Sequence, residues 1–259
     1  MIPEKIHFCW FSEEPYPEKM QKCIASWKRV LPDYEQIHWT KEKALALNIP
    51  WVNKAIKEKR WAFAADAIRL YAIWREGGIY LDTDVECIRP FTPLLNQEYF
   101  FCYENGSKRI EGAVLGAQEK NPFIKHALDF YLNTEFNFSE ENIDQFILPK
   151  VMQNAFEKFS LNIFPEEYFS PKNYYDGTIQ ITENTFCIHH FESSWRSPII
   201  QKSIERRHKL YKIFPKPVAK ILNYPVSLLA NLRTLGIKNS IIKLLHQHKF
   251  PLRVTKREF

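Results

Sequence analysis

Residues 61–86 contain the feature that most constrains the fold, a long helical pattern joined to a short strand pattern by two glycines. The segment WAFAADAIRLYAIWRE (61–76) is rich in strong helix formers and contains neither glycine nor proline. Gly77 and Gly78 follow, and glycine adopts the left-handed backbone conformation at a helix C-terminus without strain. The next residues, IYLDTDVE (79–86), predict a buried strand.

Two aspartates, two residues apart, interrupt this apolar strand pattern. Side chains alternate along a strand, so the pattern predicts one shared face for Tyr80, Asp82, Asp84 and Glu86. Three carboxylates in a row repel one another, and they remain ionised at low cost only beside positive charge. A hard divalent cation with oxygen ligands meets that need. The alternative is a half-exposed strand whose acidic face is solvated.

The preceding helix pattern carries one acid and one base on the same face. Asp66 and Arg69 are three residues apart, which places them side by side on a helix surface. Arg69 is therefore a cation close to the acidic strand. The alternative is an ordinary intrahelical salt bridge on a solvated face.

The alternation of strand and helix patterns predicts an α/β fold. Residues 5–11 and 35–39 have strand patterns, and each is followed by a helical pattern, over 17–30 and after the expected N-cap Thr40. This β-α-β-α order favours parallel strands. Beyond the acidic strand, the patterns predict strands at 98–105 and 112–118, helices at 122–133 and 142–159, and a strand that runs into a polar loop within 181–195.

The composition is that of a soluble globular protein large enough for a sizeable core. Of 259 residues, 45% are hydrophobic and 25% are charged. The five cysteines are odd in number and form no C-x-x-C pair, which indicates reduced thiols and a cytosolic setting. The N-terminus lacks the apolar core of a signal peptide, and no apolar run reaches the roughly 18 residues expected of a membrane-spanning helix.

Charge divides the chain at about residue 195. Residues 196–259 hold 15 basic and 2 acidic residues, a net charge of +13, whereas residues 1–195 hold 21 and 28, a net charge of −7. We expect a catalytic domain at 1–195 and a basic extension at 196–259 made of short amphipathic helices that break at Pro225 and Gly236.

Basic amphipathic helices commonly lie on anionic membrane surfaces, which is the partner expected for residues 196–259. The alternative is a helical cap that packs on the main domain with a solvated basic face. Nucleic acid is not an expected partner, because the body of the chain lacks helix-turn-helix, zinc-finger and RNA-recognition signatures.

Three blocks, in the same order, resemble glycosyltransferase family 32. They are IPEKIHFCWF (2–11), AADAIRLYAIWREGGIYLDTDVE (64–86) and HHFESSW (189–195). The resemblance is strong over about residues 1–90 and again at 187–195, is thin between them, and does not extend into 196–259. It implies a GT-A fold, in which a Rossmann-like mixed sheet flanked by helices binds a nucleotide-diphosphate sugar.

The resemblance also implies roles for the residues around the D-x-D pair, which holds a divalent metal, often Mn²⁺ or else Mg²⁺. Asp84 corresponds to the direct metal ligand. Asp82 corresponds to a residue that contacts the ribose or the donor sugar and reaches the metal through water. Asp66 and Arg69 match positions that hold the sugar moiety of the donor, and Tyr80 is placed to touch the nucleotide. Asp82, Asp84 and Arg69 are the expected catalytic residues.

The first and last blocks supply the remaining expected site residues. Trp10 matches the position where an aromatic ring stacks on the base. His190, Ser193 and Trp195 have the spacing of an acid, a serine and a tryptophan that surround the metal and the β-phosphate in relatives. The departure from acid to histidine makes His190 a candidate metal ligand, with His189 as the alternative.

The activity implied is the transfer of a hexose, with retention of anomeric configuration, from a UDP- or GDP-sugar to a glycan acceptor. The expected setting is the cytoplasmic face of a bacterial membrane, where a lipid-linked acceptor is extended in capsule, exopolysaccharide or O-antigen synthesis. Glu111, in EGAVLGA, is expected to face the acceptor.

Two other functions remain as alternatives. One is a non-catalytic metal-binding scaffold of a membrane glycan-assembly complex, against which the intact acidic and basic positions argue. The other is a haloacid-dehalogenase-like phosphatase. Its motif usually continues to threonine, whereas here Val85 and Glu86 follow the aspartates.

Overall fold

The computed structural model of the protein describes residues 1–106, 109–137, 143–192 and 198–247. The chain forms two compact units, Met1–Trp195 and Arg196–Phe259. Among the described residues, the strands and the acidic segment belong to the first unit. The described part of the second unit is helical.

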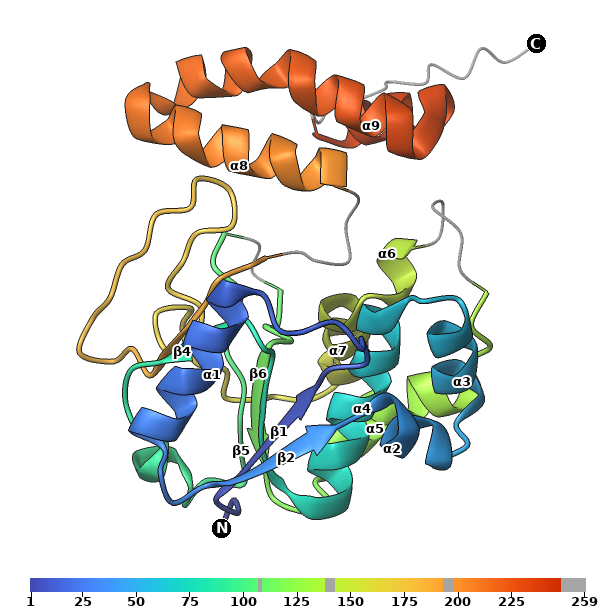
Figure 1. Cartoon of the computed structure of the whole chain (residues 1–259), viewed down its shortest axis with the longest axis vertical. Helices are drawn as coiled ribbons and strands as arrows, with labels where there is room; N and C mark the ends of the chain where they lie inside the picture. Colours follow the sequence, from blue (N-terminus) through green and yellow to red (C-terminus); the bar gives the residue numbers. More distant parts are fainter. Residues whose placement is uncertain (107–108, 138–142, 193–197, 248–259) are drawn as a thin grey trace. The chain divides into compact units, whose positions relative to one another are not determined.

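A five-stranded mixed sheet forms the centre of the first unit (Figure 1). Its order is β2-β1-β3-β6-β5, with β1 parallel to both β2 and β3, and with β6 antiparallel to β3 and β5. The parallel arrangement expected for the first three strands is therefore confirmed. The strands are β1 (Lys5–Cys9), β2 (Glu35–Trp39), β3 (Gly78–Leu81), β5 (Tyr99–Phe100) and β6 (Val114–Ala117).

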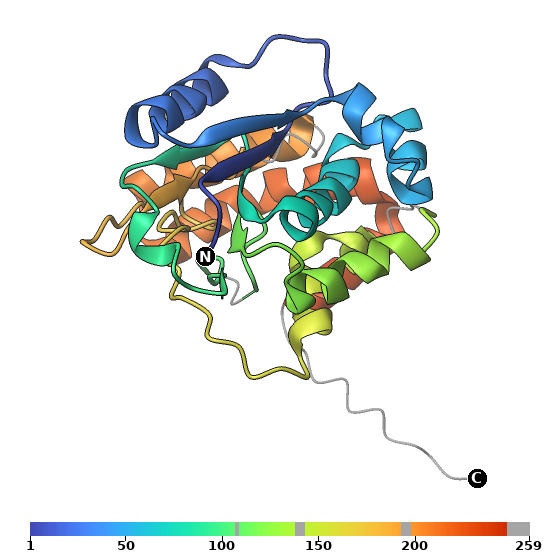
Figure 2. The ribbon, with the colours of Figure 1, turned by 90° about the horizontal axis from the view of Figure 1, so that it is seen from below.

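Hydrophobic cores lie on both faces of this sheet, because successive strand residues point to opposite sides. Ile79 and Leu81 of β3 pack in a core with Trp27 of α1 (Glu18–Val30), whereas Tyr80 packs in the other core. Viewed from below, β1 and β2 separate α1 from α4 and α5 (Figure 2). The core that contains Tyr80 is built with α2 (Lys41–Ala46), α3 (Pro50–Lys57), α4 (Trp61–Glu76), α5 (Pro122–Asn133) and α7 (Leu148–Phe156).

The connection from α4 to β3 depends on its two glycines. Helix α4 spans the predicted residues and ends at Gly77, whose φ is +65°, and Gly78 follows with a φ of +104°. A Cβ atom on Gly77 would lie 2.8 Å from the backbone nitrogen of Glu119, and one on Gly78 would lie 2.9 Å from the carbonyl oxygen of Lys5. Only glycine therefore combines this backbone conformation with such close packing.

The acidic segment is a turn between two strands, so the prediction of one continuous strand is wrong. Strand β3 ends at Leu81, and β4 (Val85–Cys87) pairs with β7 (Cys187–His189) in a separate two-stranded antiparallel sheet. The N–H of Val85 donates to the carbonyl oxygen of Asp82 over 3.0 Å and closes the turn. Aspartate is common in turns because its side chain also bonds to nearby backbone N–H groups. Glu86 consequently does not share a face with Asp82.

Other element boundaries also differ from the predictions. The helix expected at 142–159 is two helices, α6 (Ile143–Phe146) and α7, because Pro149 is accommodated near the start of a helix rather than in its interior. The strand expected at 98–105 is reduced to β5, and the strand expected within 181–195 is β7, which a loop follows over the described residues 190–192. A short 3-10 helix, η1 (Thr92–Leu94), follows β4.

Within residues 198–247, the second unit forms two helices, α8 (Pro198–Ile213) and α9 (Lys216–Gln247). Helix α9 continues through Pro225, so the predicted breaks at Pro225 and Gly236 are wrong. A proline in a helix interior costs roughly 3 kcal/mol, and packing against a second helix can offset that cost. Helices α8 and α9 are in contact, and Ala219, Asn223 and Ala230 of α9 are buried. Within the described ranges, none of the helices combines the length and the apolar character needed to cross a membrane.

Gly116 of β6 leaves room for a core aromatic ring, which makes Gly116→Ala a sharp test of the sheet. A Cβ atom at this position would lie 2.2 Å from the ring of Phe100, which is fully buried on β5. We expect the substitution to lower the free energy of unfolding by about 2 kcal/mol, measured by denaturant titration. Adding Phe100→Leu removes the clashing ring atoms, so the two losses should be less than additive. If the two losses simply add, the contact between the new methyl group and the Phe100 ring is not the cause of the destabilisation.

Candidate active site

The turn that carries Asp82 and Asp84 is fixed by hydrogen bonds to the segments that precede β6 and follow β7. The N–H of Asp82 donates to the carbonyl oxygen of Ala113 over 2.9 Å, which ties the turn to the segment leading into β6. The N–H of Glu192 donates to Oδ2 of Asp84 over 2.9 Å, just beyond β7. Two segments distant in sequence therefore hold the two carboxylates in place.

Arg69 extends from α4 toward the same turn. Its guanidinium contacts Oδ1 of Asp66 at 3.0 Å and Oδ2 of Asp82 at 3.2 Å, and it donates to the carbonyl oxygen of Gly112 over 2.5 Å. Only 6% of the Arg69 side chain is exposed. The salt bridge between Asp66 and Arg69 therefore exists, but it is buried and extends to Asp82, so the alternative of a solvated surface pair is wrong.

Tyr80 completes the surroundings of Asp82. Its hydroxyl donates to Oδ1 of Asp82 over 3.0 Å, and the Arg69 guanidinium carbon lies 4.6 Å from the centre of its ring. Both carboxylate oxygens of Asp82 thus have side-chain partners. Burial raises the pKa of Asp82, while the charge of Arg69 opposes that rise.

Burial also raises the pKa of Asp66 to about 7, although the neighbouring Arg69 acts to lower it. Because this value lies above the ordinary 3.8, the folded protein binds the Asp66 proton more tightly than the unfolded chain does. The stabilisation this proton gives is complete below about pH 4 and is lost as the pH rises through about 7.

We expect this difference to be measurable as a pH-dependent gap between the wild type and Asp66→Asn. Between about pH 4 and 7, the wild-type free energy of unfolding should fall relative to that of the variant, by at most about 1.4 kcal/mol per pH unit. Denaturant titrations in metal-free buffers across this range provide the measurement. Asp129→Asn, the same change at a half-exposed site, is the control. Parallel pH profiles for the wild type and Asp66→Asn would contradict the raised pKa.

His189, the last residue of β7, lies between two carboxylates. Its Nε2 is 3.6 Å from Oδ2 of Asp84, and its Nδ1 is 3.0 Å from Oε2 of Glu111. Burial acts to lower the pKa of His189, but the two carboxylates raise it well above its usual range. Burial acts to raise the pKa of Asp84, but the neighbouring His189 side chain outweighs this effect and holds the pKa well below its usual range.

Asp82, Asp84 and His189 form a group that could hold a metal ion. One ligand atom from each residue lies within 4.8 Å of the others. Carboxylate oxygens suit hard divalent cations such as Mg²⁺ and Mn²⁺, and an imidazole nitrogen suits transition metals. The donor set therefore fits a divalent cation.

His190 lies outside this group, so the structure favours the alternative, His189. Nε2 of His190 is 2.9 Å from Oε2 of Glu86. Glu86 is the register partner of Ile188, and residues 188 and 190 lie on the same face of an extended segment. His189 belongs to the opposite face, which meets Asp84. Glu111, expected to face an acceptor, is instead buried against His189.

Of the remaining expected site residues, Trp10 lies within the described part of the chain. Trp10 directly follows β1, and β1 is parallel to β3 with His7 opposite Tyr80, so Trp10 lies at the sheet edge where the acidic turn begins. Its Nε1 donates to the carbonyl oxygen of Glu14 over 3.0 Å. Ser193 and Trp195 lie outside the described residues.

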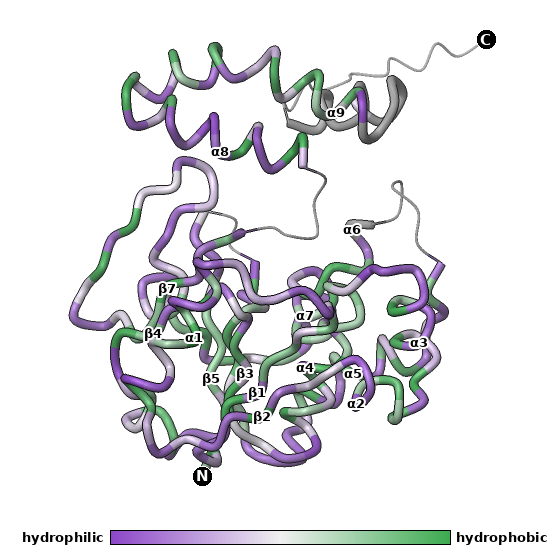
Figure 3. Tube along the Cα trace, in the orientation of Figure 1, coloured by the Kyte–Doolittle hydropathy of each residue, from purple (hydrophilic) through white to green (hydrophobic). Residues whose placement is uncertain are grey.

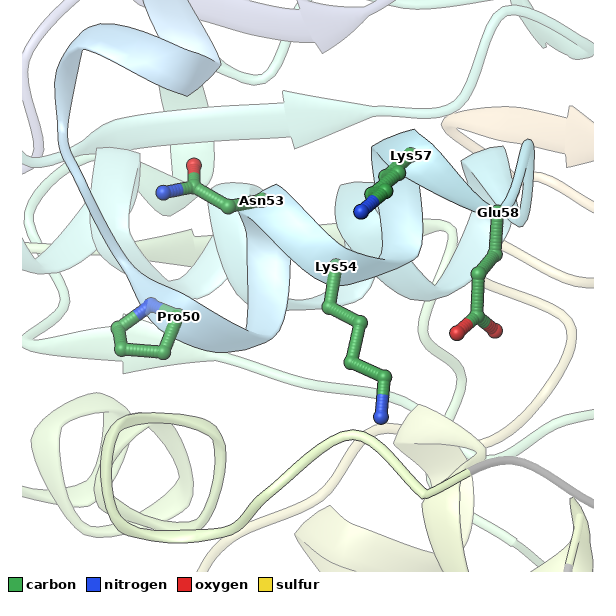
Figure 4. Close-up of a pocket in the computed structure, with 5 residues that line it drawn as sticks. All are labelled: Pro50, Asn53, Lys54, Lys57 and Glu58. Carbon is green, nitrogen blue, oxygen red and sulfur yellow. The ribbon is translucent and has the colours of Figure 1, made fainter.

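A surface depression of about 510 Å³ lies elsewhere on the first unit (Figure 4). Its lining residues all come from α3 and the residue that follows it, and none belongs to the acidic turn. Lys54, at its rim, donates from Nζ to Oδ1 of Asn137 over 3.1 Å. The depression lacks the convergent polar groups of the Asp82, Asp84 and His189 cluster, so it is not the candidate site. It is lined by Pro50, Asn53, Lys54, Lys57 and Glu58.

Comparison with protein families identifies the segment that carries Arg69 and the two aspartates. Residues 17–101 match the family described as glycosyltransferase sugar-binding region containing DXD motif. This match confirms the resemblance to glycosyltransferase family 32. The matched segment includes α4, the glycine pair and the acidic turn.

Curated relatives of this family cover part of the chain. Inositol phosphoceramide mannosyltransferase 3 of Schizosaccharomyces pombe is 31% identical over 141 residues, 53% of this chain and 39% of the relative. Mannosyl phosphorylinositol ceramide synthase SUR1 of Saccharomyces cerevisiae is 31% identical over 135 residues, 49% of this chain and 34% of the relative. The chain thus spans less than half the length of these relatives.

The solved structure described as PaToxG glycosyltransferase has a similar fold. The two structures superpose with a TM-score of 0.50 at 20% sequence identity. The aligned region covers 61% of this chain and 69% of the PaToxG chain. Together with the mixed sheet flanked by helices, this similarity confirms the predicted GT-A fold.

Proposed function

We propose that the protein is a metal-dependent, anomer-retaining glycosyltransferase that moves a hexose from a UDP- or GDP-sugar to a glycan acceptor. The observation that carries this proposal is the convergence of Asp82, Asp84 and His189 beside the buried Arg69. Sugar transfer from a nucleotide diphosphate leaves negative charge on the departing group. A site that holds a divalent cation next to the donor answers that requirement.

Asp82, Asp84 and His189 would hold Mn²⁺ or Mg²⁺. When bound, the metal supplies Lewis-acid stabilisation of the charge on the departing diphosphate. Asp84 is the main protein ligand, and the N–H of Glu192 fixes its carboxylate. His189 brings a nitrogen ligand from β7.

Arg69 and Tyr80 orient Asp82 by bonding to both of its oxygens. Asp82 then contacts the ribose or the donor sugar. Asp66 and Arg69 border the position of the sugar moiety. Because both of its oxygens are already held, the Asp82 carboxylate loses little conformational freedom when the donor binds. This favours one fixed orientation of the donor sugar.

Four aromatic and hydroxyl side chains complete the proposed donor site. Trp10 stacks on the base, and Tyr80 borders the nucleotide. Ser193 and Trp195 donate to the diphosphate oxygens. No side chain is assigned as a nucleophile, so retention is proposed to occur by attack of the acceptor on the face from which the diphosphate departs.

The acceptor we propose is lipid-linked, as in capsule, exopolysaccharide or O-antigen synthesis at the cytoplasmic face of a bacterial membrane. The names of the yeast relatives support a lipid acceptor and make a mannose donor the first candidate, because they describe mannosyl transfer involving inositol phosphoceramide.

The second unit is the proposed membrane-docking element. Along α8 and the coloured part of α9, hydrophobic and hydrophilic residues are interspersed (Figure 3). Ile213 and Ile221 are each 71% exposed near the α8–α9 connection, where Lys212, Lys216 and Lys220 also lie. Exposed apolar side chains beside lysines match the two components of binding to an anionic bilayer.

Vesicle sedimentation tests this docking. Binding of the full chain to vesicles that contain phosphatidylglycerol should weaken roughly 100-fold when all three lysines are changed to glutamine, at about 1 kcal/mol for each charge. Vesicles of neutral phosphatidylcholine are the control. If the triple variant binds the anionic vesicles as well as the wild type does, the proposed membrane role of residues 196–259 is wrong.

Calorimetry with a panel of nucleotide sugars tests the transferase proposal. In the presence of Mn²⁺, one of GDP-mannose, UDP-glucose, UDP-galactose and the UDP-N-acetylhexosamines should bind, and EDTA should abolish the binding. Turnover with that donor then identifies the product anomer by NMR. A folded protein that binds none of these donors would contradict the proposal.

A further inference from the structure

Glu111 is a buried acid whose two oxygens have different partners. Only 2% of the residue is exposed. Its Oε1 accepts from the N–H of Ala113 over 2.9 Å, and its own N–H donates to the carbonyl oxygen of Cys102 over 2.8 Å. Its Oε2 lies 3.0 Å from Nδ1 of His189. The backbone therefore holds the carboxylate in one orientation, with a single oxygen directed at the imidazole.

This arrangement determines which nitrogen of His189 is free to bind a cation. An ionised carboxylate only accepts hydrogen bonds, so Nδ1 of His189 must carry a hydrogen. The ring must be neutral to bind a cation, and Nε2 then has the lone pair; Nε2 is the atom that faces Oδ2 of Asp84 at 3.6 Å. A histidine held in this way by a carboxylate is a stronger and better oriented metal ligand.

We propose that Glu111 is a positioning residue that fixes the tautomer and ring orientation of His189, so that Nε2 completes a divalent cation site with Asp82 and Asp84. This inference depends on the metal dependence proposed above. Glu111 acts through His189 and contacts neither the donor nor the acceptor.

A second glutamate–histidine pair provides a matched comparison. Oε2 of Glu86 lies 2.9 Å from Nε2 of His190, but the Glu86 side chain is 42% exposed, and neither residue belongs to the cation-binding group. The substitution of glutamate by glutamine therefore makes the same chemical change at both pairs. Only the change at Glu111 should affect the affinity for a cation.

The experiment is a titration of the full-length protein with Mn²⁺ alone at fixed pH, in which electron paramagnetic resonance measures free Mn²⁺. In Glu111→Gln, the side-chain oxygen still accepts from the N–H of Ala113, so the amide NH2 group, which can only donate, faces Nδ1 of His189. The neutral ring then carries its hydrogen on Nε2, which can no longer bind the metal. We expect the Kd for Mn²⁺ to rise roughly 10- to 100-fold in this variant, and to stay at the wild-type value in Glu86→Gln.

A double-mutant cycle with His189→Gln separates positioning from general damage to the fold. If Glu111 acts through His189, adding Glu111→Gln to His189→Gln should leave the Kd unchanged. A further loss in that background would overturn the positioning role, as would wild-type affinity in the single variant Glu111→Gln. Equal failure of the wild type and Asp84→Asn to bind Mn²⁺ would instead overturn the proposed metal dependence, and this inference with it.

Discussion

Asp84→Asn is expected to lower kcat/KM for glycosyl transfer by roughly 1,000-fold, because the metal's charge stabilisation is worth several kcal/mol and each factor of ten corresponds to about 1.4 kcal/mol. Asparagine keeps the size of the side chain and an oxygen that accepts from the N–H of Glu192. The variant loses the negative charge that pairs with the cation. Initial rates with the donor identified by calorimetry, at several Mn²⁺ concentrations, provide the measurement.

Two comparisons make this result interpretable. Glu86→Gln removes a nearby carboxylate that lies outside the cation-binding group, and it should retain near wild-type turnover. Because ligand loss weakens metal binding, raising the Mn²⁺ concentration should recover part of the activity of Asp84→Asn. Wild-type turnover by Asp84→Asn at low Mn²⁺ would exclude Asp84 as a metal ligand.

The helix, the glycine pair and the identity of the acidic residues could be predicted from the sequence because each depends on local signals. The propensity of residues 61–76 defines α4, and the positive φ values of Gly77 and Gly78 follow from the need to leave a helix abruptly. The contact between Asp66 and Arg69 also follows from helical spacing.

The turn at the aspartates and the choice between the two histidines depend on contacts between distant parts of the chain. Asp84 and Glu192 are 108 residues apart in sequence, and the pairing of β4 with β7 brings them together. A shift of this register by one residue would exchange the faces of His189 and His190. No local pattern specifies such a register. For the same reason, no local pattern indicates that Glu111 contacts His189 rather than an acceptor.

The course of α9 illustrates a different limit of sequence patterns. Pro225 predicts a break from local rules, yet a long helix that packs along a second helix can retain its axis through one missing hydrogen bond. Helix propensity describes an isolated segment. Packing between α8 and α9 adds stability that cannot be read from any single residue.

Arg69→Met is expected to lower the free energy of unfolding by about 3–5 kcal/mol at neutral pH, since removing one partner leaves buried charge uncompensated. The guanidinium serves the carboxylates of Asp66 and Asp82 and the carbonyl oxygen of Gly112. Methionine fills a similar volume but provides no donor to any of them. The loss should shrink as the pH falls through about 7, because protonation of Asp66 removes one of the unpaired charges.

The matched control is Arg89→Met, the same substitution at an arginine whose Nε donates to the carbonyl oxygen of Thr185 and whose guanidinium lies over the ring of Phe186. This variant should lose only about 1 kcal/mol, the net value of one hydrogen bond. A loss of similar size for both arginines, with no dependence on pH, would show that Arg69 contributes packing rather than charge. A large and pH-dependent loss for Arg69 alone would show that this cation allows acidic side chains to be buried beside the D-x-D turn. Asp82 would then owe both its charge and its orientation to a residue of α4, which explains why the helix, the glycine pair and the acidic turn form one continuous segment of the chain.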